Sequence, residues 1–493
     1  MAGLGVPERF AVRSAAMTEH DADQPASAGR NVLVLMADEL TGAALDWIDL
    51  GPSLTPNIDR LRAAGIDYRR CWTPSPICVP ARAAFASGRW VHQTAHWDST
   101  VGYAGAPRSW MHAARDAGVH TVSFGKLHHQ GAMFDDGFVE RRRPMFLAGG
   151  VGWTQGLPRW DPIPYAEAAE LAEQVGAGDT TYTRYDRRIC DDAVGWLEHE
   201  APSSPWAAFV SFVAPHYPLS APTWAHEVVA AAEIEPPRHG RSLEHPAVEV
   251  MAEFFGYGDY FDAETTIAGR RAYAALVVYV DALVGEVLDA LDRSGAADDT
   301  TVIFTSDHGD LLGERGLWCK SFMFDSSVSV PMVVSGPGVP AGVTSDVAVN
   351  LVDVAPTVTA ALGVDADPEW VGASLLNPSS MDDDRIAFSE YHDGGSITGS
   401  FAIEVGRWKY VHHEGFRPEL YDRVDDPDER IDLAVDGGPP DVLGECAEVL
   451  RSIVDTTAAN DAAFADQRRA VEALGGRQIL IDGIRFNHTP VPE

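Results

Sequence analysis

The segment Cys78-Val-Pro-Ala-Arg82 places a thiol and a guanidinium about one helical turn apart, with a proline between them. A cysteine can supply a nucleophile, and a fixed cation nearby can stabilise the negative charge that develops as the nucleophile attacks an ester. In a chain of this composition the three residue types should fall at this spacing by chance roughly 0.02 times. The alternative interpretation is a buried, inert cysteine at a helix start, with Pro80 in the first turn.

Lysine is scarce in this chain, and two of its lysines lie in short polar motifs. The sequence has 34 arginines and three lysines, Lys126, Lys320 and Lys409. Arginine and lysine differ in shape and in ease of deprotonation. Lysines in an arginine-rich chain are therefore candidates for positions that need a compact, titratable ammonium group. A coding bias toward arginine is the simpler alternative. Gly125-Lys126-Leu-His128 adds a histidine two residues after one of these lysines, and His216 follows another apolar run.

Acidic and histidine side chains directly follow two apolar runs and form a candidate metal site. Asp38 and Glu39 follow the first run, and Asp307 and His308 follow a later one. Carboxylate oxygens and imidazole nitrogens suit Ca²⁺, Mn²⁺ or Mg²⁺. The sequence therefore predicts one divalent cation between these two segments, with Glu39 either a ligand or just outside the ligand set.

The apolar runs predict the elements that position these side chains. They span residues 31–37, 119–124, 206–213, 300–305 and 330–334. The first run is continuously apolar, as is typical of a strand buried on both faces of a parallel sheet, and helical periodicity at 56–64 and 271–293 alternates with the predicted strands. We therefore predict an α/β fold with a large, mostly parallel sheet flanked by helices. In such sheets the ligand-binding site lies beyond the carboxyl ends of the strands. Asp38, Lys126, His216 and Asp307 follow four of the predicted strands, so we expect them to meet at one site.

After about residue 368 the character of the sequence changes to short alternating stretches. They predict a short antiparallel sheet in a smaller second domain. The expected division is a disordered leader over 1–30, a catalytic domain over 31–375 and a small C-terminal domain with a tail over 376–493. The basic run Arg141–Arg143 is expected in a solvated turn.

Five motifs in order resemble the type I, formylglycine-dependent sulfatases of the alkaline phosphatase superfamily. These are the strand ending in Asp38-Glu39, the C-x-P-x-R segment with Gly88-Arg89, the G-K-x-H element, Pro215-His216-Tyr-Pro218, and Ser306-Asp-His-Gly309 with the later Lys320. The resemblance covers nearly the whole chain after residue 30, and it implies an alkaline phosphatase-like fold.

The resemblance also implies the chemistry and a partner. A formylglycine-generating enzyme would oxidise Cys78 to formylglycine, whose hydrated form attacks sulfur and gives a covalent sulfoester. Arg82 would hold the hydrated formylglycine and the metal cluster in place, and Lys126 would bind sulfate oxygens. His128 would accept a proton, and His216 with Lys320 would protonate or stabilise the leaving oxygen. The implied metal ligands are Asp38, Glu39, Cys78, Asp307 and His308. Many relatives have asparagine where His308 stands, which favours Mn²⁺ slightly over Ca²⁺.

The segment from Gly309 to Lys320 looks most similar to the choline-sulfatase branch, so choline sulfate or another small sulfate monoester is the expected substrate. A quaternary ammonium group would need aromatic faces and a carboxylate, and Glu390 is the candidate carboxylate. The alternative function is that of a phosphonate monoester or phosphodiester hydrolase with the same formylglycine site.

Composition excludes several other classes of protein. The formal charge of −36 opposes binding to nucleic acid or to an anionic membrane. Five widely spaced cysteines favour a reducing compartment over a disulfide framework, and the sequence shows neither a signal peptide nor a long apolar span. We expect a cytoplasmic homo-oligomer acting on a small molecule.

Overall fold

The computed structural model describes residues 30–42, 48–49, 53–165, 167–240, 243–382, 384–482 and 489–492. The predicted leader therefore lies outside the described residues, apart from Arg30. In the described part of the chain, no helix combines the length and the hydrophobicity that crossing a membrane requires.

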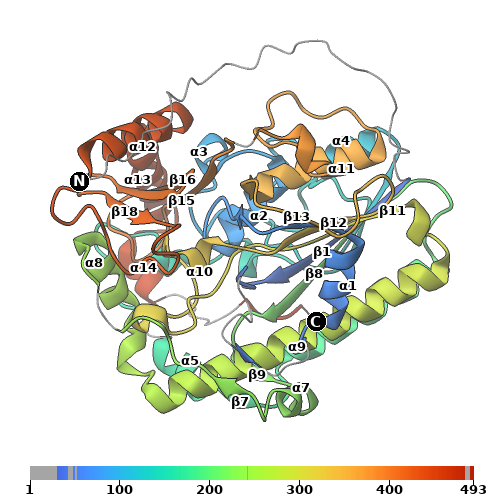
Figure 1. Cartoon of the computed structure of the whole chain (residues 1–493), viewed down its shortest axis with the longest axis horizontal. Helices are drawn as coiled ribbons and strands as arrows, with labels where there is room; N and C mark the ends of the chain where they lie inside the picture. Colours follow the sequence, from blue (N-terminus) through green and yellow to red (C-terminus); the bar gives the residue numbers. More distant parts are fainter. Residues whose placement is uncertain are drawn as a thin grey trace.

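An eight-stranded sheet forms the centre of the molecule (Figure 1). Its order is β13 (Val343–Ser345), β3 (Gly65–Tyr68), β12 (Met332–Ser335), β11 (Thr300–Ser306), β1 (Asn31–Asp38), β8 (Trp206–Pro215), β5 (His120–Lys126) and β6 (Glu140–Met145). The neighbours of β1 are both parallel to it, and β12 is antiparallel to both of its neighbours. The prediction of a mostly parallel sheet is confirmed.

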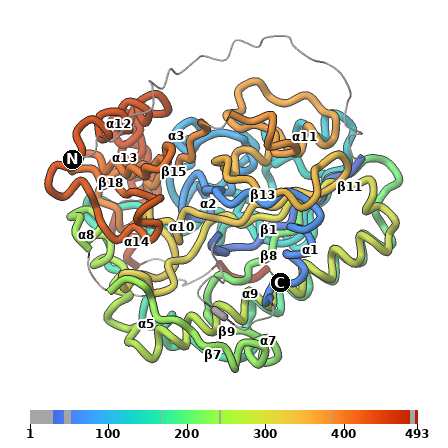
Figure 2. Tube along the Cα trace, viewed as in Figure 1, coloured from blue at the N-terminus to red at the C-terminus, as the bar shows by residue number. Residues whose placement is uncertain are grey.

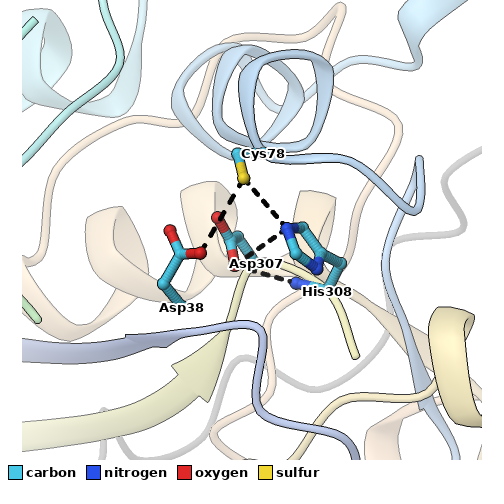
Figure 3. A group of neighbouring side chains, drawn as sticks. All are labelled: Asp38, Cys78, Asp307 and His308. Carbon is cyan, nitrogen blue, oxygen red and sulfur yellow. Dashed lines mark hydrogen bonds and ion pairs between the residues drawn. The ribbon is translucent and has the colours of Figure 1, made fainter. Parts of the chain in front are cut away.

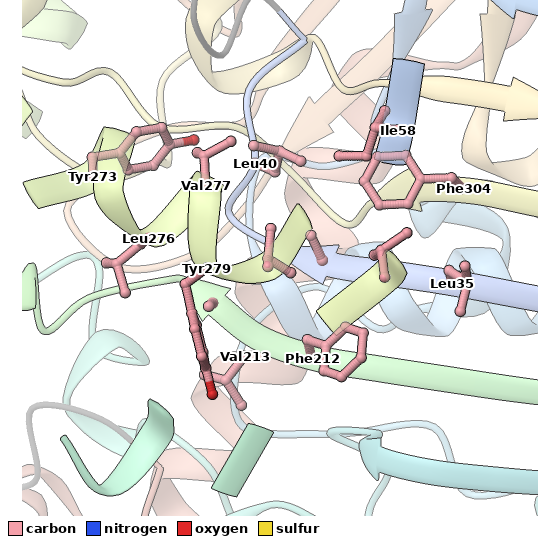
Figure 4. Packing of buried hydrophobic residues seen from close by; sticks show 14 of the residues in the cluster. Leu35, Leu40, Ile58, Phe212, Val213, Tyr273, Leu276, Val277, Tyr279 and Phe304 are labelled. Atoms are coloured by element: carbon pink, nitrogen blue, oxygen red, sulfur yellow. The ribbon is translucent and has the colours of Figure 1, made fainter. Parts of the chain in front are cut away.

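Successive side chains of β1 enter two different hydrophobic cores because they point to opposite faces of the sheet. Leu33, Leu35 and Ala37 join the core beneath α9 (Ala263–Ser294) and α6 (Thr181–His199). Figure 4 shows Leu35, Phe212 of β8 and Val277 of α9 as members of this core. A strand buried on both faces has no polar side, which explains why its sequence is continuously apolar.

The other face of β1 is covered by a second group of helices. Val32, Val34 and Met36 pack in a core with residues of α2 (Cys78–Ser87), α4 (Trp110–Asp116) and α11 (Val354–Leu362). In Figure 1, α11 and α4 lie on the side of the sheet opposite α9. All ten residues of α2 are buried.

The predicted antiparallel sheet is also present. It contains β15 (Ala387–Tyr391), β16 (Ser400–Val405), β17 (Trp408–His413) and β18 (Glu419–Asp422), in that order. Helices α12 (Pro440–Ile453) and α13 (Thr456–Ala473) cover it, and Figure 2 shows them close to α3 (Val91–Thr94). Their hydrophobic core includes Val91 of α3 and Val352, so the small sheet packs directly on the larger part of the chain.

Two expectations about elements were wrong. Arg141–Arg143 lie in β6, the edge strand of the large sheet, and not in a turn. Charged residues are common on edge strands, where one side of the backbone faces solvent. The long helix α9 begins at Ala263, capped by the side chain of Asp262, well before the predicted start at residue 271. Its first turns are too polar to show a helical apolar pattern.

Candidate active site

The predicted site residues meet at the carboxyl ends of four neighbouring strands. Ala37 of β1 is in register with Ser306 of β11, which brings Asp38 next to Asp307. On the other side of β1, Asp38 is in register with Pro215, the residue before His216. Lys126 ends β5, the next strand along. The sheet therefore assembles the site from segments that are far apart in the sequence.

Cys78 is the first residue of α2, and its thiol points at the ends of β1 and β11 (Figure 3). Its Sγ lies 3.0 Å from Nε2 of His308 and 3.8 Å from Oδ1 of Asp38. The Lys126 ammonium is 3.9 Å away. Burial, with Asp38 nearby, raises the pKa of the Cys78 thiol to about 11. An unmodified thiol here is protonated at neutral pH and is a weak nucleophile.

Arg82 holds the cluster together from the next turn of α2. Its guanidinium donates to Oδ2 of Asp38 at 2.8 Å and to Oδ2 of Asp307 at 2.7 Å. It also donates to the Lys126 carbonyl at 2.7 Å and to the Ser211 hydroxyl at 2.9 Å. The side chain is 2% exposed, and a planar fork of donors suits such a set of fixed acceptors.

Lys126 and Asp38 form a close buried ion pair, with Nζ 2.5 Å from Oδ2. Burial alone would raise the pKa of Asp38, but Lys126, His216 and Arg82 outweigh it and hold that pKa well below its ordinary value. Asp38 is therefore ionised at neutral pH, as a metal ligand must be.

His216, Lys320 and Glu39 form a second polar group beside the first. The Lys320 ammonium donates to Nε2 of His216 at 2.7 Å and lies 3.1 Å from Oε2 of Glu39. His216 Nδ1 donates to the Tyr217 carbonyl, which leaves Nε2 as the acceptor. Burial, and then Lys320 and Lys126, lower the pKa of His216 well below its ordinary value. His216 is therefore neutral at pH 7 and accepts the hydrogen bond of the Lys320 ammonium, which is the proton donor of the pair.

Glu39 is held by its backbone as much as by its side chain. Its φ is +67°, and Tyr273 donates a hydrogen bond to its carbonyl at 2.8 Å. A left-handed conformation is costly for a residue other than glycine, so surrounding contacts must stabilise it. Burial raises the pKa of Glu39 to about 8, although Lys320 opposes this. Its Oε1 is buried and finds no hydrogen-bond partner within the described residues.

His128 is the last of the predicted catalytic residues in the pocket. Its Nε2 is 3.0 Å from the hydroxyl of Thr489, and its Nδ1 is buried without a hydrogen-bond partner among the described residues. Burial, together with Lys126 and Arg82, lowers the pKa of His128 well below its ordinary value. The imidazole is therefore neutral at pH 7 and can accept a proton.

The residues present fit a divalent cation. Ligand atoms of Asp38, Cys78, Asp307 and His308 all lie within 4.8 Å of one another, and all four residues are buried. His308 Nδ1 lies 3.0 Å from the Gly309 carbonyl and donates to it, so Nε2 carries the free lone pair toward the cluster. Glu39 belongs to a separate, overlapping group with Asp38 and His216. Its buried Oε1 has no hydrogen-bond partner among the described residues, and this also fits a bound cation nearby.

A pocket of about 120 Å³ opens above this cluster. This is small beside the 300–1,000 Å³ of typical sites for drug-sized ligands. Cys78, Lys126, His128, His216 and Lys320 all line it. Much of the remaining wall is aromatic, and its aromatic members are Trp153, Tyr165, Tyr182, Tyr217, Phe255 and Tyr257.

Glu390 was wrongly predicted to face the substrate. Both of its carboxylate oxygens are used, one by the backbone N–H and ring of His92 and the other by the ring of His392. The side chain is fully buried and is not part of the pocket wall. Among the described residues of that wall, the carboxylate is Glu167.

Sequence reasoning missed two residues that contact the predicted set. Ser211 accepts a hydrogen bond from Arg82, and it is the single polar residue in the apolar run over 206–213, which was an available signal. Thr489 contacts His128 from a segment without periodicity, and no signal in the sequence marks it.

Sequence comparisons with known proteins find similarity to sulfatases. The sulfatase family model matches residues 30–364, and a model described as N-sulphoglucosamine sulphohydrolase, C-terminal, matches 313–453. The chain is 30% identical over 423 residues to the choline-sulfatase of Rhizobium meliloti, covering 82% of each chain. It is 29% identical over 453 residues to arylsulfatase K of Danio rerio, covering 86% of this chain and 84% of that protein.

Solved structures show the same fold at lower identity. A phosphonate monoester hydrolase of Agrobacterium radiobacter superposes with a TM-score of 0.67 at 24% identity, covering 86% of this chain and 95% of that one. A 2-O GAG sulfatase superposes with a TM-score of 0.67 at 21% identity, covering 94% of this chain and 97% of that one. The central sheet, its helical layers and the four-stranded antiparallel sheet match this architecture.

Proposed function

The chain belongs to the sulfatase family and is a sulfuric ester hydrolase, and on this premise we propose that Cys78, converted to formylglycine, supplies its nucleophile. The observation that carries the proposal is the position of Cys78 Sγ, 3.0 Å from His308 and 3.9 Å from Lys126 at the floor of the pocket. The raised pKa of the thiol supports conversion, because the unmodified side chain would be protonated. A hydrated aldehyde would supply two hydroxyls, one to attack sulfur and one to expel sulfate afterwards.

Asp38, Asp307, His308 and the modified side chain of residue 78 would hold one divalent cation. When bound, such a cation neutralises sulfate oxygens and makes a nearby hydroxyl more acidic. We propose Ca²⁺ or Mn²⁺, with Mg²⁺ the third candidate, on the chemistry of the ligand set. Glu39 is proposed to stand beside the ligands and to pair with Lys320, in keeping with their 3.1 Å contact.

The remaining side chains have separate proposed roles. Lys126, next to both Asp38 and Cys78, would bind a sulfate oxygen and oppose the charge that grows there. Lys320, hydrogen-bonded to His216, would protonate the leaving oxygen. His128 would take the proton that is released when sulfate departs. Arg82 would keep the two aspartates at their spacing throughout.

For the alcohol portion we propose a small group, with choline sulfate the first ester to test. The small volume of the pocket and its aromatic wall support this. A quaternary ammonium group binds through cation–π contact and Coulomb attraction, and Glu167 is the carboxylate in the described wall of the pocket. The likeness to the choline-sulfatase of Rhizobium meliloti points the same way.

A substrate panel tests the proposal. We expect turnover of choline sulfate or a small alkyl sulfate to exceed that of a phosphonate monoester and a phosphodiester of matching size. Cys78→Ala should abolish it, whereas Cys446→Ala, a buried cysteine outside the pocket, should not. Preference for the phosphonate would favour the alternative hydrolase, whose support here is a likeness of fold.

We also propose a modifying partner, a cellular state and a domain boundary. A formylglycine-generating enzyme would be the partner that modifies Cys78. The protein would be cytoplasmic, in keeping with five cysteines that form no disulfide, and it would be a homo-oligomer. The boundary near residue 375 would divide a catalytic domain over 31–375 from a small domain over 376–493, supported by the start of the antiparallel sheet at Ala387. Mass measurement in solution and cell fractionation would test the second of these.

A further inference from the structure

The segment 489–492 reaches the active-site pocket from the far end of the sequence. Thr489 is part of the pocket wall, together with Cys78 and His128. Its hydroxyl lies 3.0 Å from Nε2 of His128. Its carbonyl accepts a hydrogen bond from the Tyr182 hydroxyl at 2.7 Å. Thr489 is therefore fixed through both its side chain and its backbone to residues of the site.

The residues that follow Thr489 are anchored outside the pocket. Val491 packs against the large hydrophobic core beneath the sheet. Val491 and Pro492 also line a groove of about 880 Å³ that includes Trp224 and Tyr279. Pro490 and Pro492 restrict the backbone φ angles, so the segment loses little further entropy by lying there in one conformation.

This segment contributes Thr489 to the wall of a small pocket. The pocket has a volume of about 120 Å³, and Thr489 is part of its wall. A larger alcohol that extended toward this part of the wall would meet the Thr489 side chain. The hydrogen bonds to His128 and Tyr182 oppose displacement of the segment.

We propose that Thr489 is a specificity-determining residue, and that segment 489–492 forms the wall of the pocket that admits small sulfate esters and rejects bulky ones. The inference rests on the proposed sulfate ester hydrolysis at Cys78. It adds a residue that contacts the substrate from a segment otherwise remote from the catalytic motifs.

The test compares kcat/KM for ethyl sulfate and for a bulky aryl sulfate in wild type and four variants. Wild type should prefer the small ester. Thr489→Gly, and a chain that stops after residue 488, should raise the ratio of bulky to small at least about tenfold, since a methylene-sized change in a pocket is worth 10–200-fold in selectivity. Thr489→Val keeps the volume but loses the hydroxyl, so its ratio should stay within about twofold of wild type. Ile431→Ala, at an exposed position outside the pocket, is the matched control.

The outcomes separate this inference from the function beneath it. If wild type hydrolyses no sulfate ester, the proposed function fails. If wild type hydrolyses small sulfate esters, the wall is refuted by either of two results. One is equal turnover of bulky esters by wild type, and the other is an unchanged ratio in both Thr489→Gly and the shortened chain. Thermal melting of each variant identifies any change that comes from loss of folding.

Discussion

Asp38 ends β1, Asp307 directly follows the parallel neighbour β11, and one guanidinium joins them: Arg82 donates to Oδ2 of each, at 2.8 and 2.7 Å. This bridge leaves the Oδ1 atoms of both aspartates facing the Cys78 and His308 side. It also balances two buried negative charges that would otherwise repel each other at short range. The geometry of the proposed cation site thus depends on a residue outside the proposed ligand set.

Replacing Arg82 with lysine should therefore weaken both folding and catalysis. A lysine can reach only part of the four acceptors that Arg82 satisfies, so we expect a loss of about 3 kcal/mol in the free energy of unfolding. We expect kcat/KM to fall at least about a hundredfold. Denaturant titration and steady-state kinetics measure the two effects. Arg60→Lys, in an exposed pair with Asp289, should change stability by less than about 0.5 kcal/mol. Wild-type activity in Arg82→Lys would contradict the bridging role.

The state of Cys78 can be read directly by mass spectrometry. In active protein, the peptide that contains residue 78 should be about 18 Da lighter than its thiol form and should react with hydrazides, as an aldehyde does. Cys78→Ala should be folded and inactive, with its melting temperature close to that of wild type. Full activity in a preparation whose peptide keeps the thiol mass would rule out the formylglycine route.

Metal content should follow the two aspartates. Asp38→Asn and Asp307→Asn should each reduce bound divalent cation to below about a tenth of wild type, since each loses a charged oxygen ligand. Elemental analysis after chelation and reloading gives the content. Asp281→Asn is the control, because that carboxylate binds the start of α1 (Pro56–Ala64) and lies outside the cluster. A full metal complement in both site variants would place the cation elsewhere.

His128 should make stability depend on pH. Its folded-state pKa lies well below its ordinary value of about 6.5, so below that pH the unfolded chain binds a proton that the folded protein does not. The free energy of unfolding is therefore highest above about pH 6.5, and it falls below that pH by about 1.4 kcal/mol per pH unit. Urea titrations between pH 7.5 and 5 should show this extra slope in wild type and not in His128→Gln. Parallel pH profiles for the two proteins would show that His128 titrates normally.

The sequence predicted the strand ends of the site well for a physical reason. A strand buried on both faces carries almost no charged side chains, so its end is marked by the first charged residue, as at Asp38 and Asp307. Contacts between segments carry no such mark. Thr489 beside His128, and His92 beside Glu390, arise from how distant parts of the chain pack, and no local pattern encodes them.

The edge strand β6 bears on how the molecule behaves among copies of itself. An eight-stranded sheet ends in exposed backbone donors and acceptors on which another chain could add a strand. On β6, Arg141, Arg142 and Arg143 are followed by Pro144, and Arg142 and Arg143 form ion pairs with Glu200 and Asp192. Strand addition there would have to strip water from these charges, and Pro144 offers no N–H to bond. The basic run thus protects the large sheet against aggregation at the edge formed by β6.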